Sequence, residues 1–214
     1  MLTNLSMYLE ALKLKQKEIF NKLDKFPEFY LVGGTGLALQ MGHRISDDFD
    51  MFGDKLLDRN FIAKIYRVFK GYDIKFSLRH SEQMNLTVDL VKFNFVKYSY
   101  PLIFKLKKIN NVNVASIKEI ALMKSSTLGS RASLKDYVDL YFILKKKKIT
   151  IEDIIEGCKK KYKTEFNDRL FLEELTYMRD IKDVKIEFLK KKVDKIKIER
   201  FFEKEIKKLK INKI

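Results

Sequence analysis

The spacing of apolar residues changes along the chain, and the changes predict which segments form helices and which form strands. Leu5–Leu23 carries leucine, tyrosine and isoleucine at helical spacing, with lysines between them. This pattern predicts an amphipathic helix that Pro27 ends. The apolar run Phe29–Val32 then predicts a short buried strand, and Gly33-Gly34 predicts a turn directly after it.

The remainder of the N-terminal part alternates short helical and extended segments. Helices are predicted over Thr35–Met41, which Gly42 would stop, and over Arg59–Phe69. Strands are predicted over Phe49–Phe52, Ile74–Leu78, Asn85–Phe95 and Val112–Val114. This order of elements predicts an α+β fold in which residues 1–115 form a small mixed sheet with helices on one side.

Beyond residue 115 the pattern is helical only. Ser116–Glu119 has the Ser-x-x-Glu form of a capping box, and Ser133–Asp136 repeats that form with Asp before the helical run Tyr137–Lys146. The last helix is predicted over Val184–Leu209. An all-helical C-terminal module over residues 116–214 is therefore expected.

The composition is that of a folded and strongly basic protein. Hydrophobic residues make up 46% of the 214 residues, and 45 Lys and Arg against 29 Asp and Glu give a net charge of +16. Such a charge suits a polyanionic partner, and it suits a solvated lysine-rich surface equally well. Cys158 is the only cysteine, which excludes an internal disulfide. Without the pattern of a signal peptide or membrane span, the chain is expected in the cytoplasm, with no membrane partner.

Two aspartates beside the predicted strand Phe49–Phe52 are the first sign of chemistry. Residues two apart in a strand share a face, so Asp48 and Asp50 point one way while Phe49 and Met51 point into the core. Neighbouring carboxylates repel each other, and Mg²⁺ is the usual cation that offsets this cost. Asp47 faces the other way and is expected to be dispensable. The commoner meaning of Asp-x-Asp taken alone is a solvated turn.

Two further features belong to the same region of the predicted sheet. Gly33 and Gly34 lie between a strand and a helix, where backbone N–H groups can bind an anion and missing Cβ atoms let a phosphate approach. Asp89 lies within an apolar segment, where a carboxylate requires a partner or a metal. The simpler alternatives are an ordinary tight turn for the glycines and a water-facing edge strand for Asp89.

Together these features predict the layout of a two-metal nucleotidyl-transfer site. The glycine turn would hold the triphosphate of an NTP. Asp48 and Asp50 would bind the Mg²⁺ ions that bridge the phosphates, and Asp89 would complete the binding of the metal that activates the attacking hydroxyl. The positive charge of the bound Mg²⁺ ions would compensate the repulsion between the three carboxylates, which could then lie close together.

The segment Gly33–Phe52 resembles the first motif of the AbiEii/AbiGii-type nucleotidyltransferase toxins, which belong to the DNA polymerase beta-like nucleotidyltransferase superfamily. The similarity includes the run His-Arg-x-Ser-x-Asp-x-Asp, which is far more specific than Asp-x-Asp. A second similar block comprises Glu119–Lys124, Arg131 and Lys135–Tyr141. The tail beyond these helices carries no resemblance.

This resemblance implies an NTP- and Mg²⁺-dependent transferase that acts as the toxin of a toxin–antitoxin pair, with a cognate antitoxin as partner. Some members add nucleotides to the 3′ end of tRNA. By position, the expected metal ligands are Asp48 and Asp50, and the strand pattern adds Asp89 as the third. These three residues with Lys124 and Asp136 form the expected catalytic set. The expected nucleotide-binding residues are Gly33, Gly34, Thr35, Arg44, Ser46 and Lys124.

Three of these residues also have ordinary structural interpretations. Asp136 could complete a capping box with Ser133. Lys124 could be a plain surface lysine on an amphipathic helix. Arg44 could form an ion pair with Asp47 or Asp48.

The sequence leaves three functions open. The first is a toxin that transfers a nucleotide to RNA, which the basic charge favours, with the 3′ end of tRNA as the acceptor that the resemblance implies. The second is nucleotide transfer to a protein or to a small hydroxylated molecule at the same site. The third is a basic RNA-binding module with a dead site, which the presence of both aspartates and both glycines disfavours.

Overall fold

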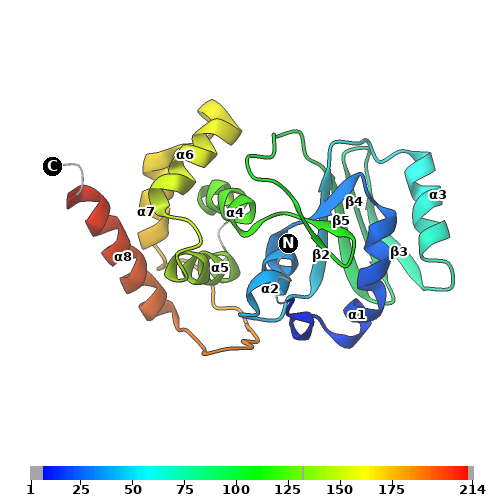
Figure 1. The fold of residues 1–214 in the computed structure, drawn as a ribbon, viewed down its shortest axis with the longest axis horizontal. Coiled ribbons are helices and arrows are strands. Elements are labelled where there is room, and N and C mark those ends of the chain that lie inside the picture. Colours follow the sequence, from blue (N-terminus) through cyan, green and yellow to red (C-terminus); the bar gives the residue numbers. More distant parts are fainter. Residues whose placement is uncertain (1–6, 132, 212–214) are drawn as a thin grey trace, which may run out of the picture. The chain divides into compact units, whose positions relative to one another are not determined.

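A computed structural model describes residues 7–131 and 133–211 of the chain (Figure 1). The structure has α+β architecture, with a mixed seven-stranded sheet and separate helices. The predicted fold class is therefore confirmed. Among the described residues, no helix combines the length and the apolarity that crossing a bilayer requires.

The chain divides into two compact units. The first comprises Met1–Ser99 and Lys105–Ser116, and the second comprises Tyr100–Phe104 and Ile117–Ile214. The single boundary predicted after residue 115 placed Tyr100–Phe104 in the first unit. The structure places this segment in the second unit because the backbone N–H groups of Ile103 and Phe104 donate to Glu119 Oε2 at 3.0 and 2.9 Å.

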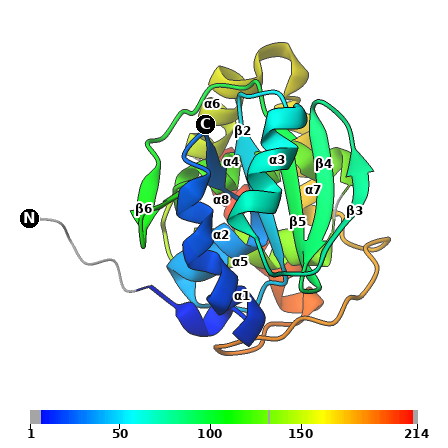
Figure 2. The same ribbon diagram turned by 90° about the vertical axis from the view of Figure 1, so that its right-hand side faces the viewer.

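The sheet of the first unit has the order β3-β4-β5-β2-β1-β7-β6, with β3 and β6 at its edges (Figure 2). β1 pairs with β7 and β2 pairs with β5 in parallel, while the other pairs are antiparallel. The strands are β1 (Phe29–Leu31), β2 (Asp48–Gly53), β3 (Ile74–Arg79), β4 (Gln83–Val88), β5 (Val91–Lys97), β6 (Lys107–Ile109) and β7 (Val112–Val114).

An aromatic core covers one face of this sheet, which we call the core face. Alternate residues of β2 and β5, such as Phe49 and Phe93, are buried there. Helices α1 (Leu14–Phe20) and α3 (Arg59–Val68) lie on this face (Figure 2). Phe61 of α3, for example, has its ring centroid 5.0 Å from that of Phe95. Burial of these rings is the main apolar contribution to the stability of the unit.

Helix α2 (Gly33–Met41) lies on the opposite face, so the prediction of helices on one side only is wrong. A Cβ atom at Gly33 would overlap the side chain of Asp50, which points away from the core face. The predicted end of this helix is correct. Gly42 caps it with a left-handed backbone, φ 55°, and its N–H donates to Ala38 O at 2.8 Å.

The predicted helix Leu5–Leu23 is broken into shorter pieces, and its first two residues lie outside the described residues. A 3₁₀ turn η1 (Leu9–Ala11) is followed by extended backbone at Leu12, then by α1 and a second 3₁₀ turn, η2 (Asn21–Lys25). The break is stabilised by a new helix start, because the N–H of Lys13 donates to Gln16 Oε1 at 3.0 Å.

The predicted single strand Asn85–Phe95 is in fact a hairpin of β4 and β5. The turn residues Asp89 and Leu90 have positive φ values of 46° and 69°. This is the conformation of tight hairpin turns, where Asn-Gly or Asp-Gly is usual. Because this turn contains no glycine, the sequence contains no indication of a hairpin at Asp89 and Leu90. A second hairpin, β6–β7, also turns on two positive-φ residues, and β6 was not predicted.

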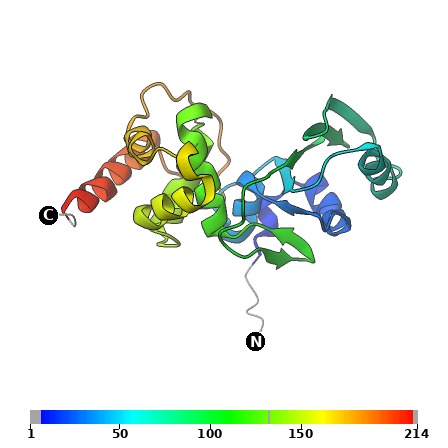
Figure 3. The same ribbon diagram turned by 90° about the horizontal axis from the view of Figure 1, so that it is seen from above.

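The second unit is built from helices and a 3₁₀ turn (Figure 3). They are α4 (Ile117–Arg131), α5 (Leu134–Lys145), α6 (Ile151–Tyr162), η3 (Lys163–Glu165), α7 (Asp168–Thr176) and α8 (Lys195–Ile211). The last helix begins at Lys195 and not at the predicted Val184. Asp194 explains the start, because its carboxylate accepts from the N–H of Lys197 at 2.7 Å.

Candidate active site

The two motif aspartates lie on β2 as the alternation predicts. Asp48 and Asp50 are partly exposed, whereas Phe49 and Met51 are fully buried in the core. The predicted register of this strand is therefore confirmed. We call the side of the sheet that carries Asp48 and Asp50 the aspartate face. Asp47 precedes the strand, is exposed, and forms an ion pair with Lys13.

The start of α2 is held directly against this strand. The N–H of Val32 donates to Asp50 O at 2.9 Å, and the hydroxyl of Thr35 donates to Asp48 O at 2.5 Å. The first N–H groups of a helix have no carbonyl partner within the helix. The amides of Gly33 and Gly34 are therefore presented beside the two carboxylates as a site for an anion.

Neither glycine could carry a side chain without displacing a site residue. A Cβ atom at Gly33, whose φ is +64°, would overlap Asp50 Oδ2. At Gly34 it would overlap the guanidinium group of Arg44 and lie 2.8 Å from the hydroxyl of Ser46. The spacing of the motif thus brings the helix start, Arg44 and Ser46 together, as the resemblance implies.

Arg44 is buried at this point of the site, with 2% of the residue exposed. Its Nη1 donates to Ile45 O at 3.0 Å, and its Nη2 lies beside Gly34. Asp47, one of the two ion-pair partners considered for Arg44, forms an ion pair with Lys13. The guanidinium group is therefore placed where the oxygens of an anion at the helix start could meet it.

The carboxylates differ in how their oxygens are satisfied. Asp50 Oδ1 accepts from the side-chain amide of Asn94 at 2.7 Å, where Asn94 is the residue of β5 directly paired with Asp50. Asp48 Oδ1 is buried and has no hydrogen-bond partner among the described residues. An orphaned carboxylate oxygen next to a second carboxylate fits a hard divalent cation, which prefers oxygen ligands. The donor set therefore suits Mg²⁺.

Asn94 is the residue of this site that the sequence did not reveal. Its importance depends on the parallel pairing of β2 with β5, which no local pattern encodes. An asparagine inside an apolar strand was the available signal.

Asp89 is not part of a three-acid cluster. Its Oδ1 accepts from the N–H of Asp73 at 2.9 Å, and its Oδ2 lies 3.6 Å from Lys15 Nζ. Within the part of the chain that the structure describes, no group of three or more His, Cys, Asp or Glu side chains is placed to hold a metal ion. The expected convergence of Asp48, Asp50 and Asp89 is therefore wrong, because Asp89 caps a hairpin turn instead of lying in a strand.

The second motif block forms an ion cluster between α4 and α5 in the helical unit. Lys124 Nζ lies 2.6 Å from Asp136 Oδ1 and 2.8 Å from Asp139 Oδ2. The side chain of Lys124 is 9% exposed and that of Asp139 is fully buried. Lys124 is therefore not a plain surface lysine, and Asp139 is a member of the cluster that the predicted site did not include.

Ser133 begins α5 in a different manner from the predicted capping box. Its hydroxyl accepts from the N–H of Lys135 at 3.4 Å, while the carboxylate of Asp136 binds Lys124. The neighbouring Tyr137 hydroxyl donates to Glu174 O at 2.9 Å. Burial raises the pKa of Tyr137 above its usual range, so this phenol stays protonated and acts as a structural donor.

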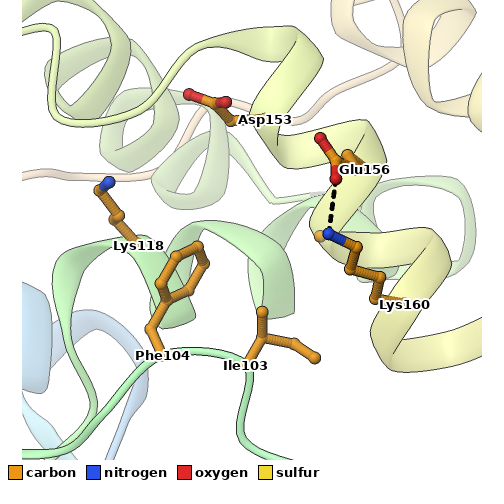
Figure 4. Close-up of a pocket in the computed structure, with 7 residues that line it drawn as sticks. Ile103, Phe104, Lys118, Asp153, Glu156 and Lys160 are labelled. Carbon is orange, nitrogen blue, oxygen red and sulfur yellow. Dashed lines mark hydrogen bonds and ion pairs between the residues drawn. The ribbon is translucent and has the colours of Figure 1, made fainter.

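The helical unit also contains a pocket of about 170 Å³ (Figure 4). It is lined by Ile103, Phe104, Lys118, Asp153, Glu156 and Lys160, with Gly157. Lys160 and Glu156 form an ion pair across one turn of α6 at 2.5 Å. None of the predicted site residues lines this pocket, so we place the chemistry at the aspartate face.

A mixed sheet with Asp-x-Asp on a central strand, faced by a glycine-started helix, defines a nucleotidyltransferase. Comparison with known proteins gives the same class. Residues 17–210 match the family described as nucleotidyl transferase AbiEii toxin of type IV toxin–antitoxin systems, and the chain belongs to this family. It is therefore a nucleotidyltransferase of a toxin family.

The similarity extends over whole chains. An uncharacterised protein of Aquifex aeolicus is 30% identical over 206 residues, which cover 93% of this chain and 98% of that protein. MenT4, a nucleotidyltransferase toxin of Mycobacterium tuberculosis, has a similar structure with TM-score 0.55 and 15% identity, over 90% of this chain and 85% of MenT4. JHP933 of Helicobacter pylori gives TM-score 0.51 and 14% identity, over 98% of this chain and 100% of JHP933. At these identities, the two structures show a shared fold.

Proposed function

We propose that the chain is a Mg²⁺-dependent toxin that transfers a nucleoside monophosphate from an NTP to the 3′ end of an RNA, with tRNA as the acceptor. The observation that carries the proposal is Asp48 Oδ1, which is buried without a partner on the face that the start of α2 approaches. Such an atom is costly unless a bound cation satisfies it. The net charge of +16 favours a polyanionic acceptor over a protein.

The helix start would hold the triphosphate. In this proposal the amides of Gly33 and Gly34 donate to phosphate oxygens, and the positive end of the helix dipole adds a favourable field. Arg44 and Ser46 border the same space and would donate to the same group. Thr35 positions the turn through its hydrogen bond to the backbone of Asp48.

The two carboxylates of β2 would hold Mg²⁺ through Asp48 Oδ1 and Asp50 Oδ2. Bound Mg²⁺ neutralises charge that develops on the phosphate oxygens and lowers the pKa of the attacking hydroxyl. Asn94 would fix the orientation of the Asp50 carboxylate, because its amide donates to Oδ1 at 2.7 Å. Asp89 is excluded from the proposed metal ligands because its oxygens bind Asp73 and Lys15.

The transfer replaces a phosphoanhydride bond of the NTP with a phosphodiester bond to the acceptor. The 3′ hydroxyl oxygen of the acceptor bonds to the α-phosphorus while the bond from that phosphorus to pyrophosphate breaks, and the hydroxyl proton is released. We assign Lys124 to a phosphate contact, as the resemblance implies. Asp136, whose Oδ1 lies 2.6 Å from Lys124 Nζ, would orient Lys124. Asp139 would share that orienting role.

The test is a labelling assay on total RNA and total protein from one extract, with Mg²⁺ and each of the four labelled NTPs. We expect label in tRNA, and we expect Asp48→Ala to abolish it while Asp47→Ala retains it. Label in protein with unlabelled RNA would support transfer to a protein and refute the RNA acceptor. A dead module would bind no Mg²⁺-NTP in isothermal titration calorimetry.

Membership of a toxin family of type IV systems implies a cognate antitoxin, and we propose that one controls this activity. NTPs and tRNA are found together in the cytoplasm, so we expect the reaction there. Co-expression of the neighbouring gene product with the toxin would test the pairing, since an antitoxin should restore growth that the toxin alone inhibits.

A further inference from the structure

The aspartate face continues past β2 toward the β3 edge, and the strand register shows which residues it carries. Directly paired residues of neighbouring strands point to the same side of a sheet. Asp48 pairs with Lys92 of β5, Lys92 pairs with Thr87 of β4, and Thr87 pairs with Lys75 of β3. A row of two lysines and a threonine therefore extends sideways from Asp48.

A second row begins at the other motif aspartate. Asp50 pairs with Asn94, and Asn94 pairs with Asn85 of β4. The side chain of Gln83 donates to Asn85 Oδ1 at 3.3 Å, so the amide groups are linked. Amide side chains offer both donors and acceptors, as the edge of a nucleobase does.

A third row lies beside Phe52, the next residue of β2 on this face. Phe52 pairs with Val96, and Val96 pairs with Gln83. Phe52 and Val96 are partly exposed, although the equivalent residues of the opposite face are buried. A half-exposed ring next to hydrogen-bonding amides can stack on a base.

These three rows contain no acidic side chain beyond Asp48 and Asp50. Lys75 forms an ion pair with Asp73 at 2.8 Å, so its charge is partly compensated. Lys92 is exposed, is the direct neighbour of Asp48, and takes part in no ion pair within the described residues. An uncompensated lysine beside the proposed transfer site is suited to a phosphate group of the acceptor.

We propose that this surface binds the single-stranded 3′ end of the RNA acceptor, and we name it the acceptor face. It consists of Lys92, Thr87, Asn94, Asn85, Gln83 and Phe52. Lys92 contacts a backbone phosphate, Asn85 and Gln83 bond to base edges or ribose hydroxyls, and Phe52 stacks on a base. The continuity of the rows with Asp48 and Asp50 brings the terminal hydroxyl to the transfer site. This inference rests on the proposed transfer to RNA.

The test measures binding without transfer, so that its result does not depend on the proposed activity. A fluorescently labelled single-stranded RNA of eight nucleotides is titrated with the full chain, in the absence of Mg²⁺ and NTP, by fluorescence anisotropy. Lys92→Ala should weaken binding about tenfold at low salt and reduce the slope of log K against log salt by about 0.7, the value for one phosphate contact on a single strand. Asn85→Ala should weaken binding without changing that slope.

Lys70→Ala is the matched control. Lys70 is exposed, follows α3 on the core side of the sheet, and loses the same charge on substitution. It should retain wild-type affinity within about twofold, a change of about 0.4 kcal/mol. Each of the three replaced side chains is at least partly exposed, so the variants should fold as the wild type does. Circular dichroism and thermal unfolding check this expectation.

Two outcomes would overturn the acceptor face. One is equal RNA affinity of Lys92→Ala and wild type, and the other is an equal loss for Lys92→Ala and Lys70→Ala, which would indicate net charge alone. A further titration with Mg²⁺-NTP separates the two proposals. Unchanged NTP affinity in Lys92→Ala confines its defect to the acceptor, whereas wild type that binds RNA but transfers no nucleotide refutes the proposed function only.

Discussion

Buried charge is treated differently in the two units. In the helical unit, Lys161 and Glu119 are both fully buried and lie 2.7 Å apart, and Lys161 Nζ also donates to Pro101 O at 2.6 Å. The second oxygen of Glu119 accepts two backbone N–H groups. In the sheet unit, Asp48 Oδ1 is buried with no partner among the described residues.

The difference separates a structural charge from a functional one. A buried polar atom that lacks a hydrogen bond costs about 1–3 kcal/mol, and more when it is charged. The Lys161–Glu119 pair avoids this cost by bonding within the fold, and it thereby attaches Tyr100–Phe104 to the helical unit. The buried oxygen of Asp48 retains this unfavourable free energy in the absence of a ligand, which is consistent with an oxygen that binds a cation. The Lys124 cluster is intermediate, because Asp136 remains 15% exposed.

Replacement of Asp48 should give the largest effect on activity. Asp48→Asn removes a proposed metal ligand, which contributes several kcal/mol to the transition state, so transfer should fall on the order of a thousandfold or more. The free energy of unfolding should stay equal or rise, since an unpartnered carboxylate is removed. NTP labelling and urea unfolding measure the two effects. A large loss of stability would make Asp48 a structural residue.

Replacement of Lys161 should have the opposite profile. Lys161→Met leaves Glu119 buried without its counter-charge, and the free energy of unfolding should fall by about 3–5 kcal/mol. Mg²⁺-NTP affinity, measured by calorimetry well below the melting temperature, should remain because the proposed metal ligands Asp48 and Asp50 lie in the other unit. If the free energy of unfolding of Lys161→Met equals that of the wild type, the Lys161–Glu119 pair is not the structural charge that we describe.

A side chain at the helix start should affect the nucleotide moderately. In Gly34→Ala the new Cβ displaces Arg44 or Ser46 from beside the proposed triphosphate site. We expect the Kd of Mg²⁺-NTP to rise about tenfold, or about 1.4 kcal/mol. Gly71→Ala serves as a control, since a Cβ there meets no atom within 4 Å, although its φ of +89° makes some loss of stability expected. Unchanged NTP affinity in Gly34→Ala would argue against an anion site at α2.

The smallest effect is expected at Asp47. Its ion pair with Lys13 is exposed, with side-chain exposures of 46% and 58% respectively, so Asp47→Ala should change stability by less than about 0.5 kcal/mol. Transfer activity in the labelling assay should remain close to wild type. If Asp47→Ala were as inactive as Asp48→Asn, the assignment of the metal ligands along β2 would be wrong.

Local patterns predicted the parts of the site that depend on neighbours in the chain. The alternation around Phe49 placed Asp48 and Asp50 on one face, and the glycine pair marked the helix start. Gly42 ended α2 as expected. Each of these depends on periodicity or backbone conformation within a few residues, which the sequence states directly.

Patterns failed where backbone conformation was unusual or partners were distant. Asp89 adopts a positive φ without a neighbouring glycine, so the hairpin gave no signal. Asp139 and the Lys161–Glu119 pair depend on which helices pack together. The early start predicted for the last helix failed because Asp194, a capping residue, ends an irregular segment that is also rich in apolar and lysine residues.

The sequence by itself determined the family motif, the α+β class and the two aspartates on a common strand face. Only the tertiary structure decided that Asn94 meets Asp50, that Lys92 is the neighbour of Asp48, and that Asp89 does not join the acids. The physical reason is strand register. The side-chain period of a strand is local, but the partner across a parallel pair is set by the whole core that aligns β2 with β5.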